Sequence, residues 1–427
     1  MSDEVFIELC ETGSLQQIVD AIEDGANVHA RDTRNRTPIT TAARNNPNPA
    51  VITTLIKAGA DVETEDGRMT PLMWAAWRNP NPEVITALVN AGADVNASQS
   101  FGWTPLMHAV SGNSNPEVIS TLVKAGADVN VKDRGEKWQF PWAAAINLDP
   151  ENQRMTAGGK TLLMLAVWDS HNPEVIPALV KAAVDVNAKD EDGQTALMFA
   201  AGVPHPEMVT ALVNVGADVN AKEKYGNTAL MFAAREKSNA KTITALTKAG
   251  ADVNAADKDG MTALMFAAAQ GSPDLKMVTA LVNAGADVNA REKYGNTALI
   301  LAARANSNPN VMTALTKAGA DVNAMDSPNG WTALMTAIRE RRNPNPKVIR
   351  NLVKAGADVN GRTKFGGSTP LILAAEGFAP KVITLLLDLG ADPKAKDSSG
   401  KMAIDHARKN KNLKNTDVLK KLEEISR

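Results

Sequence analysis

The sequence is poor in the residues on which several classes of protein depend. Cys10 is the one cysteine in 427 residues, so the chain cannot form an internal disulfide framework. Lys and Arg number 46 and Asp and Glu number 48, and the resulting net charge of -2 provides no field that attracts nucleic acid or an anionic membrane. We therefore expect a partner of neither kind.

Long apolar runs are also missing. The longest uncharged apolar clusters, such as TLLMLAVW from Thr161 to Trp168, are too short to cross a bilayer. The start of the chain, MSDEVFIELCETG, has neither the basic residues nor the apolar stretch of a signal peptide. These absences predict a soluble, cytoplasmic protein, with export as an effector as the alternative.

Catalytic motifs are equally scarce. No GxSxG, HExxH, Walker or dinucleotide-binding glycine pattern stands between a predicted strand and a helix. His171 and His205 could approach one another, but no cysteine and no clear carboxylate partner lies beside them. The sequence therefore predicts no catalytic residues, no metal site and no cofactor.

What the chain does have is self-similarity. The string GADV or a close variant recurs along it, beginning at Gly25, Gly59, Gly92, Gly126, Ala183, Gly216, Gly250, Gly285, Gly319, Gly356 and Gly390. The intervals are 33 to 37 residues, except for the 57 residues between Gly126 and Ala183. A period of this size indicates a repeat architecture in which neighbouring units stack.

Each unit predicts two helices followed by a turn-rich loop. In the copy that starts at Met69, TPLMWAAW is an apolar-periodic stretch. A second helix is expected after Asn81, which suits an N-cap, with Pro82 at the first helical position and an apolar face between Val84 and Val89. Gly92 stands where this helix needs a left-handed residue at its end.

These units resemble the ankyrin repeat, whose pattern of about 33 residues opens with T-P-L-H-x-A. Ten openings match, at Thr37, Thr70, Thr104, Thr161, Thr195, Thr228, Thr262, Thr297, Thr332 and Thr369. Met or Ile replaces the family's histidine in nine of them, which substitutes apolar packing between first helices. The resemblance implies an all-α solenoid of about twelve helix–helix–hairpin units with one insertion.

The resemblance covers essentially the whole chain as a single solenoid. We expect an N-terminal cap at 1–34, repeats at 35–130, an insertion or degenerate repeat at 131–160, repeats at 161–394 and a C-terminal cap at 395–427. The Thr and Asp rows recur in nearly every copy, and we interpret them as requirements of turn geometry rather than as metal ligands or acid–base groups.

Differences between the copies carry the functional prediction. The resemblance implies that a partner is chosen by variable positions on the concave side, on the first helices and the loop tips. The predicted partner-binding set from these positions is Trp74, Trp77, Trp103, His108, Trp168, Phe199, Tyr225, Phe232, Arg235, Phe266, Tyr294, Leu301, Arg304, Trp331 and Arg339.

Two interpretations of this set stay open. In the first, the side chains line a long groove, apolar in the middle and flanked by arginines, that a partner occupies. In the second, Phe199, Phe232 and Phe266 stack on one another as part of the core.

The insertion adds Trp138, Phe140 and Trp142 to the predicted set. Gly126 to Thr161 is 35 residues where 11 or 12 are usual, so about 23 are inserted, and WQFPWAAA loosely mimics a first helix. The three aromatics either clamp a partner or cover apolar surface of the stack itself, and we favour the covering role.

The sequence predicts a monomeric, non-catalytic scaffold that binds a protein partner through the concave face. One alternative is an effector or immunity-type inhibitor that occludes the active site of a partner enzyme. The other is an enzyme whose site lies at the insertion.

Overall fold

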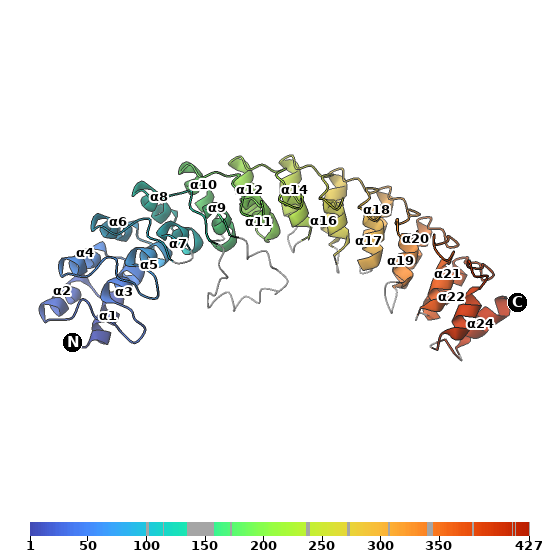
Figure 1. The fold of residues 1–427 in the computed structure, drawn as a ribbon, viewed down its shortest axis with the longest axis horizontal. Helices are drawn as coiled ribbons and strands as arrows, with labels where there is room; N and C mark the ends of the chain where they lie inside the picture. The colour runs from blue at the N-terminus through green and yellow to red at the C-terminus, as the bar shows by residue number, and fades with distance from the viewer. Residues whose placement is uncertain are drawn as a thin grey trace. The chain divides into compact units, whose positions relative to one another are not determined.

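The computed structural model describes residues 1–99, 102–113, 115–134, 158–170, 173–235, 240–270, 274–305, 308–339, 345–377, 380–411, 413–414 and 416–426, with backbone alone at 169 and 170. These residues form two compact units, Met1–Lys224 and Tyr225–Arg427, and each is described by itself (Figure 1). One continuous solenoid across both units stays a prediction.

Helix pairs make up the N-terminal unit, and the members of each pair are here named the first and second helix of a repeat. The first helices are α1 (Asp3–Thr12), α3 (Pro38–Asn45), α5 (Pro71–Arg78), α7 (Pro105–Gly112), α9 (Leu162–Leu165) with its π-helical continuation η2 (Ala166–Ser170), and α11 (Ala196–Gly202). The second helices are α2 (Leu15–Glu23), α4 (Pro49–Lys57), α6 (Pro82–Asn90), α8 (Pro116–Lys124), α10 (Val175–Lys181) and α12 (Pro206–Asn214).

The C-terminal unit repeats the arrangement. Its first helices are α13 (Ala229–Arg235), α15 (Ala263–Ala268), α17 (Ala298–Ala305), α19 (Ala333–Arg339), α21 (Pro370–Glu376) and α23 (Ala403–Lys409). Its second helices are α14 (Ala240–Lys248), α16 (Leu275–Asn283), α18 (Pro309–Lys317), α20 (Pro346–Lys354), α22 (Pro380–Asp388) and α24 (Asp417–Ile425). Within the described ranges no strand forms and only isolated bridges occur, so the predicted all-α repeat fold is confirmed.

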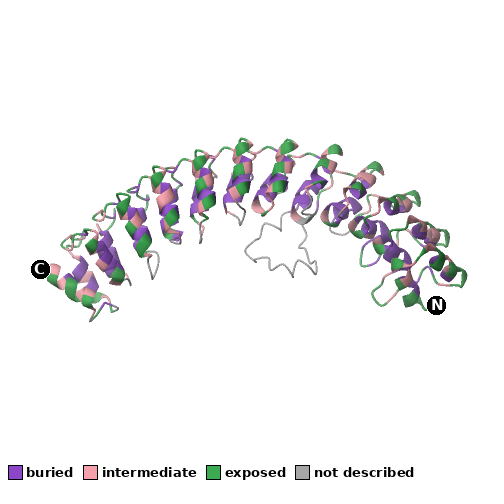
Figure 2. Ribbon diagram, turned by 180° about the vertical axis from the view of Figure 1, so that it is seen from behind, coloured by how far each residue is buried: buried purple, intermediate pink, exposed green. Residues whose placement is uncertain are grey.

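The helices of each unit form two layers. First helices contact the first helices of neighbouring repeats, as α5 contacts α3 and α7, and second helices do the same, as α6 contacts α4 and α8. Figure 2 shows buried residues on the sides by which the helices face one another and exposed residues on their outer turns. Because one repeat cannot bury its apolar face alone, stacking on its neighbours supplies its stability.

Local signals fix the helix ends as predicted. The Thr70 hydroxyl accepts a hydrogen bond from Met73 N (3.3 Å), and Pro71 occupies the first turn of α5. Asn81 caps α6 by accepting from Glu83 N (3.0 Å). Gly92 follows α6 with a φ of 96°, a left-handed conformation that costs glycine least.

An asparagine after the first helix ties a repeat to the one before it at Asn46, Asn79 and Asn113. Asn79 is fully buried, and its Nδ2 donates to Ala43 O (3.0 Å) and Asn46 O (2.9 Å) at the end of α3. Its Oδ1 accepts from Asn81 N (3.1 Å), the residue that caps α6. One asparagine therefore satisfies carbonyls that the preceding helix leaves unpaired and also orients the second helix of its own repeat.

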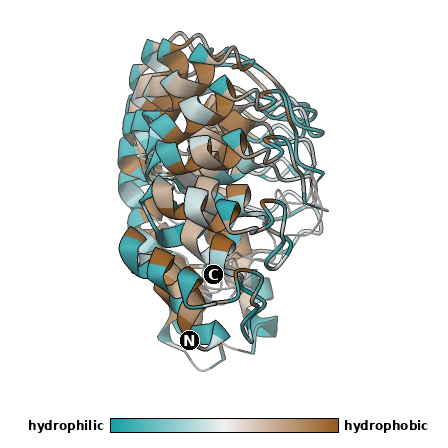
Figure 3. Ribbon diagram, turned by 90° about the vertical axis from the view of Figure 1, so that its left-hand side faces the viewer, coloured by the Kyte–Doolittle hydropathy of each residue, from teal (hydrophilic) through white to brown (hydrophobic). Residues whose placement is uncertain are grey.

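The asparagine of most GADVN motifs joins neighbouring hairpins. Asn289 Nδ2 donates to Gly319 O (3.0 Å), and its Oδ1 accepts from Asp321 N (2.7 Å). Asp321 Oδ1 accepts from Asn323 N two residues later (3.0 Å). The same pattern recurs along both units, so the Asp rows serve turn geometry, as predicted. In Figure 3 the connecting loops project to one side of the helices in the N-terminal unit, which faces the viewer.

The insertion lies in the tip of a hairpin. Asp133 N donates to Lys160 O (3.1 Å), while Asp133 accepts from Gly159 N (3.0 Å) and Lys160 N (2.8 Å). In the uninterrupted hairpin after α10, residue 190 forms the same three bonds with residues 193 and 194. In the uninterrupted hairpin two residues lie between 190 and 193. In the hairpin with the insertion 25 residues lie between the equivalent positions 133 and 159, which is 23 more.

The repeats on either side of the insertion stack directly. Helix α7 contacts α9 and η2, and α8 contacts α10, as neighbouring repeats do elsewhere. The insertion therefore does not separate the two repeats. Residues 135–157, with the predicted contacts Trp138, Phe140 and Trp142, lie outside the described residues. In the part of the chain that the structure describes, no helix is both long and apolar enough to cross a membrane.

Candidate functional site

A partly exposed tryptophan pair lies on α5. The ring centroids of Trp74 and Trp77 are 5.6 Å apart. The Arg44 guanidinium of α3 lies 4.6 Å from the Trp74 centroid, and that of Arg78 lies 4.1 Å from the Trp77 centroid. We name these four side chains the tryptophan stack. The two indole rings lie next to each other, and one guanidinium lies against each of them. Arg78 is exposed and Arg44 is half-buried, so both cations of the stack reach the surface.

The next repeat supports the stack with a buried histidine. His108 of α7 is 4% exposed; its ring lies 6.4 Å from Trp77 and meets Trp103 edge-on at 5.0 Å. Burial lowers the pKa of His108 to about 3, because the charged imidazolium would lose its hydration. Nε2 of His108 and Nε1 of Trp74 are buried without a hydrogen-bond partner among the described residues.

A second aromatic contact lies further along the N-terminal unit. Trp168 of η2 meets Phe199 of α11 edge-on, with centroids 6.2 Å apart. Phe199 is 8% exposed, whereas Trp168 is partly exposed. Trp168 is therefore the one member of this pair that a partner could reach.

Arginines lie against three aromatic residues of the C-terminal unit. The Arg235 guanidinium lies 5.3 Å from the Phe232 ring and 5.4 Å from the Phe266 ring, which places one cation across α13 and α15. Arg339 lies 5.3 Å from Trp331 and also pairs with Glu376 (3.1 Å).

Arg304 and the two tyrosines of the predicted set lie at the surface of the same unit. Arg304 is exposed, and its Nη2 donates to Asn296 Oδ1 (3.3 Å). Tyr225 and Tyr294 are 59% and 53% exposed on hairpin tips.

Comparison with known proteins identifies the family. A family model described as "Ankyrin repeats (3 copies)" matches residues 6–99, 78–133, 163–257, 236–326 and 306–397, which together cover most of the chain. The chain belongs to the ankyrin repeat family. A search of curated proteins found no match. Ankyrin repeats generally mediate protein–protein interaction, which is consistent with a binding scaffold.

Burial removes part of the predicted contact set from this ankyrin repeat protein. The side chains that are less than a tenth exposed are Trp103, His108, Phe199, Phe232 and Leu301. The groove interpretation needed them at the surface, so it was wrong for these five, and they belong to the core. Trp103 precedes the capping Thr104, and the apolar Met69 at the same position of the previous repeat was an available signal of burial.

Sequence reasoning also missed both cations of the site, since neither Arg44 nor Arg78 is in the predicted set. Arg78 was outside the predicted set because it follows the two variable positions of its helix rather than occupying one. Its exposed place beside Trp77 depends on packing between side chains of one helix, although an arginine next to a tryptophan was a visible signal.

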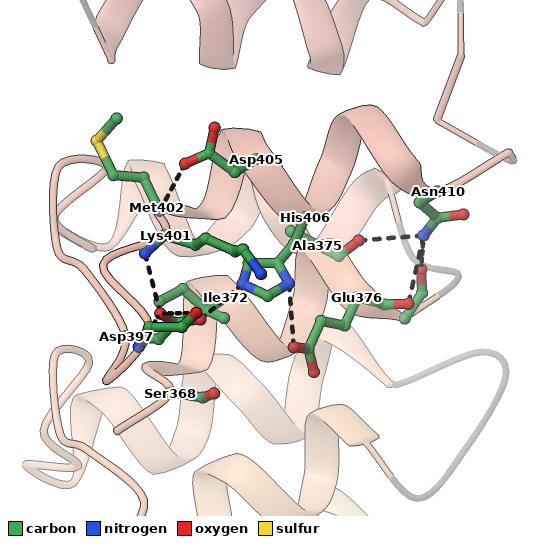
Figure 4. A network of polar contacts seen from close by, with 12 residues as sticks. Ser368, Ile372, Ala375, Glu376, Asp397, Lys401, Met402, Asp405, His406 and Asn410 are labelled. Atoms are coloured by element: carbon green, nitrogen blue, oxygen red, sulfur yellow. Dashed lines mark hydrogen bonds and ion pairs between the residues drawn. The ribbon is translucent and has the colours of Figure 1, made fainter. Parts of the chain in front are cut away.

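A polar network joins the last repeats of the C-terminal unit (Figure 4). His406 Nε2 lies 2.8 Å from Asp397 Oδ2, and its Nδ1 lies 3.2 Å from Glu376 Oε1. Desolvation alone would raise the pKa of Asp397, but hydrogen bonds from Lys401 N, from Ser399 and from His406 together hold it well below its usual range. Glu376 thus joins α21 to α23, while Asp397 fixes the turn before α23 against His406, and we assign the network a structural role.

Metal-binding clusters are absent from the described ranges. No group of three or more His, Cys, Asp and Glu side chains gathers there in a way that could hold an ion. His205 pairs with Glu207 (3.0 Å), and His171 lies outside the described residues.

Proposed function

We propose that the chain is a monomeric, non-catalytic scaffold of the cytoplasm that binds a protein partner through the first-helix surface of its N-terminal unit. The observation that carries the proposal is the tryptophan stack, in which two partly exposed indoles lie between two arginines. Trp and Arg are the residues that most often dominate binding energy at protein interfaces. The buried, neutral ring of His108 in the next repeat lies 6.4 Å from that of Trp77.

Other members of the predicted set keep a supporting role in this proposal. Their side chains are partly or fully exposed, and they are Trp168, Tyr225, Arg235, Phe266, Tyr294, Arg304, Trp331 and Arg339. An effector or immunity-type inhibitor would use the same surface, and the identity of a captured partner would separate that role from scaffolding.

The test is a binding measurement on the full chain. Wild-type protein is used to capture and identify a partner, and calorimetry then compares Trp77→Ala and Arg78→Ala with Lys57→Ala, an exposed substitution at the end of α4. We expect Trp77→Ala to weaken binding at least about tenfold and Lys57→Ala to have no effect. Equal affinity of all four proteins would remove the tryptophan stack from the interface.

A further inference from the structure

The hairpin tips of the C-terminal unit are joined in series. One backbone hydrogen bond connects each tip to the next: Lys258 N to Tyr225 O (2.9 Å), Lys293 N to Asp259 O (2.9 Å), Ser327 N to Tyr294 O (2.7 Å), Lys364 N to Asn329 O (3.0 Å) and Ser398 N to Gly366 O (2.9 Å). We name these linked tips, from 225 to 398, the tip row. The backbone of each tip is therefore held next to that of the following tip.

Exposed aromatic side chains project from every second tip. Tyr225, Tyr294 and Phe365 are 59%, 53% and 68% exposed, and they stand 69 and 71 residues apart, which is two repeats. The turn that presents Tyr294 depends on Gly295, which has a φ of 78° and where a Cβ would lie 2.8 Å from Ser327 N of the next tip. A single exposed ring would need no explanation, so the regular spacing of the three rings is the feature that distinguishes this row.

Positive charge dominates the same row. The exposed cations of the turn segments 256–261, 291–296, 325–331, 362–368 and 396–401 are Lys258, Arg291, Lys293, Arg362, Lys364 and Lys396. Asp259 is the one acidic residue in these segments that is classed as exposed, and Lys293 pairs with it (2.8 Å). The other carboxylates turn inward to accept N–H groups of their own turns, as Glu292 does from Asn296 N (2.9 Å). The outer surface of the tip row is therefore cationic.

Cations and rings occur together on the tips. Lys293 Nζ lies 4.9 Å from the Tyr294 centroid, and Lys364 Nζ lies 5.7 Å from the Phe365 centroid. Each of these tips offers an apolar surface with an ammonium group beside it. A matching ligand carries apolar side chains flanked by carboxylates.

We propose that the tip row binds an extended, acidic segment of the protein partner, with carboxylates against Lys258, Lys293 and Lys364 and apolar side chains against the exposed rings. The proposal deepens the proposed function and rests on it, since it names the chemistry of the partner. At roughly 10 Å per repeat, successive rings lie about 20 Å apart, which about six residues of extended chain would span.

The same spacing disfavours a single-stranded nucleic acid. Proteins that bind single strands stack successive bases on aromatic rings. Rings about 20 Å apart are separated by several nucleotides, so successive bases could not stack on them. The lysines beside Tyr294 and Phe365 also occupy part of the space that a base would need.

Fluorescence anisotropy on the full chain tests the proposal with three labelled probes. They are a peptide of about 15 residues built from Glu-Glu-Leu repeats, the same peptide with Gln in place of Glu, and oligothymidylate. We expect the Glu peptide alone to bind, and its affinity to fall as salt rises from about 50 mM to about 200 mM. The triple variant Lys258→Gln/Lys293→Gln/Lys364→Gln should weaken binding about tenfold.

A second triple variant controls for total charge. Lys248→Gln/Lys317→Gln/Lys354→Gln removes as many cations from exposed ends of the second helices α14, α18 and α20, and should bind the Glu peptide like wild type. Equal losses in both triple variants, equal binding of the Gln peptide, or tighter binding of oligothymidylate would each overturn the proposal. Neither triple variant changes a residue of the tryptophan stack. A negative result for the tip row would therefore not contradict the proposed function, which the Trp77→Ala and Arg78→Ala measurements test separately.

Discussion

Gly112 at the end of α7 lies against the indole of Trp77 on α5. A Cβ atom at position 112 would stand 2.2 Å from both Cδ1 and Nε1 of that ring, so a larger residue cannot fit while the ring stays where it is. The absence of a side chain at Gly112 therefore leaves the space that the ring of Trp77, in the preceding repeat, occupies. The geometry of the tryptophan stack depends on this pairing.

Gly112→Ala should displace Trp77 and weaken partner binding. The added methyl group overlaps the ring, and relief of such an overlap typically costs about 1–3 kcal/mol of stability or moves the side chain. We expect a shift in tryptophan emission and near-ultraviolet circular dichroism while the far-ultraviolet spectrum stays helical. Affinity for a captured partner should fall about tenfold.

The matched control is Gly377→Ala. Gly377 occupies the same position of a later repeat, but a Cβ there would meet only Leu373 O at 3.4 Å and Ala374 O at 3.7 Å, which are ordinary contacts. This variant should bind like wild type. If Gly112→Ala also binds like wild type, the position of the Trp77 ring is not important for the interface.

His108 should make the N-terminal unit sensitive to acid. Its pKa is about 3 in the folded chain and about 6.5 when unfolded, so between these values the unfolded state holds more protons and stability falls as the pH is lowered. At about pH 5 the penalty amounts to about 2 kcal/mol relative to about pH 8. His108→Leu removes the titrating group and should reduce the difference in stability between the two pH values by that amount.

Urea unfolding followed by tryptophan emission measures this difference. His29→Gln is the control, since His29 is exposed, and it should keep the wild-type dependence on pH. A His108→Leu protein that loses as much stability in acid as wild type would show that other groups cause the loss.

Helix positions could be predicted from the sequence because their signals are local. Thr70, Pro71 and Asn81 act within one turn of the helices they begin. The helix boundaries of a repeat can therefore be predicted from the sequence of that repeat alone. Stacking could be predicted from the period alone, since a helix pair of this size leaves an apolar face uncovered.

Exposure of single side chains could not be predicted in the same way, because it depends on two repeats at once. Phe232 and Phe266 occupy equivalent positions, yet Phe232 is buried and Phe266 is partly exposed. Trp77 keeps its place because Gly112 of the following repeat leaves room for it. Variation between neighbours therefore decides which predicted contacts reach the surface.

Asp397→Ala should loosen the last repeat of the C-terminal unit. The substitution removes the acceptor for Ser399 N (2.8 Å) and Lys401 N (3.0 Å) and the carboxylate that faces His406. We expect a local loss of about 3 kcal/mol at neutral pH. Because the folded pKa of Asp397 is lowered, wild type keeps this stability above about pH 4 and loses it as the pH falls further.

Hydrogen exchange of the α23 amides reports this loss directly. Exchange should accelerate in α23 and α24 and stay unchanged in α17, which lies several repeats away. Glu424→Gln, an exposed substitution in α24, serves as the control. Uniform acceleration throughout the unit would argue against a local role for the network.

Replacing residues 134–158 by Glu-Asp should leave a folded protein. The replacement recreates the Asp-Glu-Asp-Gly turn that begins at Asp190, and Asp133 already forms with Gly159 and Lys160 the bonds that such a turn requires. Shortening this loop from 25 residues to 2 with its base preserved should stabilise the fold by about 2 kcal/mol, because a shorter loop loses less entropy on closure. The unfolding midpoint should therefore be no lower than that of wild type.

A longer deletion and a dye measurement complete this test. Removing 133–160 eliminates the paired base, so it should disrupt the stacking of α7 on α9, whereas the Glu-Asp replacement should not. If Trp138, Phe140 and Trp142 cover apolar surface of the stack, the replacement should bind more hydrophobic dye than wild type. An unchanged dye signal in a folded replacement would refute the covering role. Weaker affinity of the replacement for a captured partner would then favour the clamp, because wild type and the replacement share the same paired base.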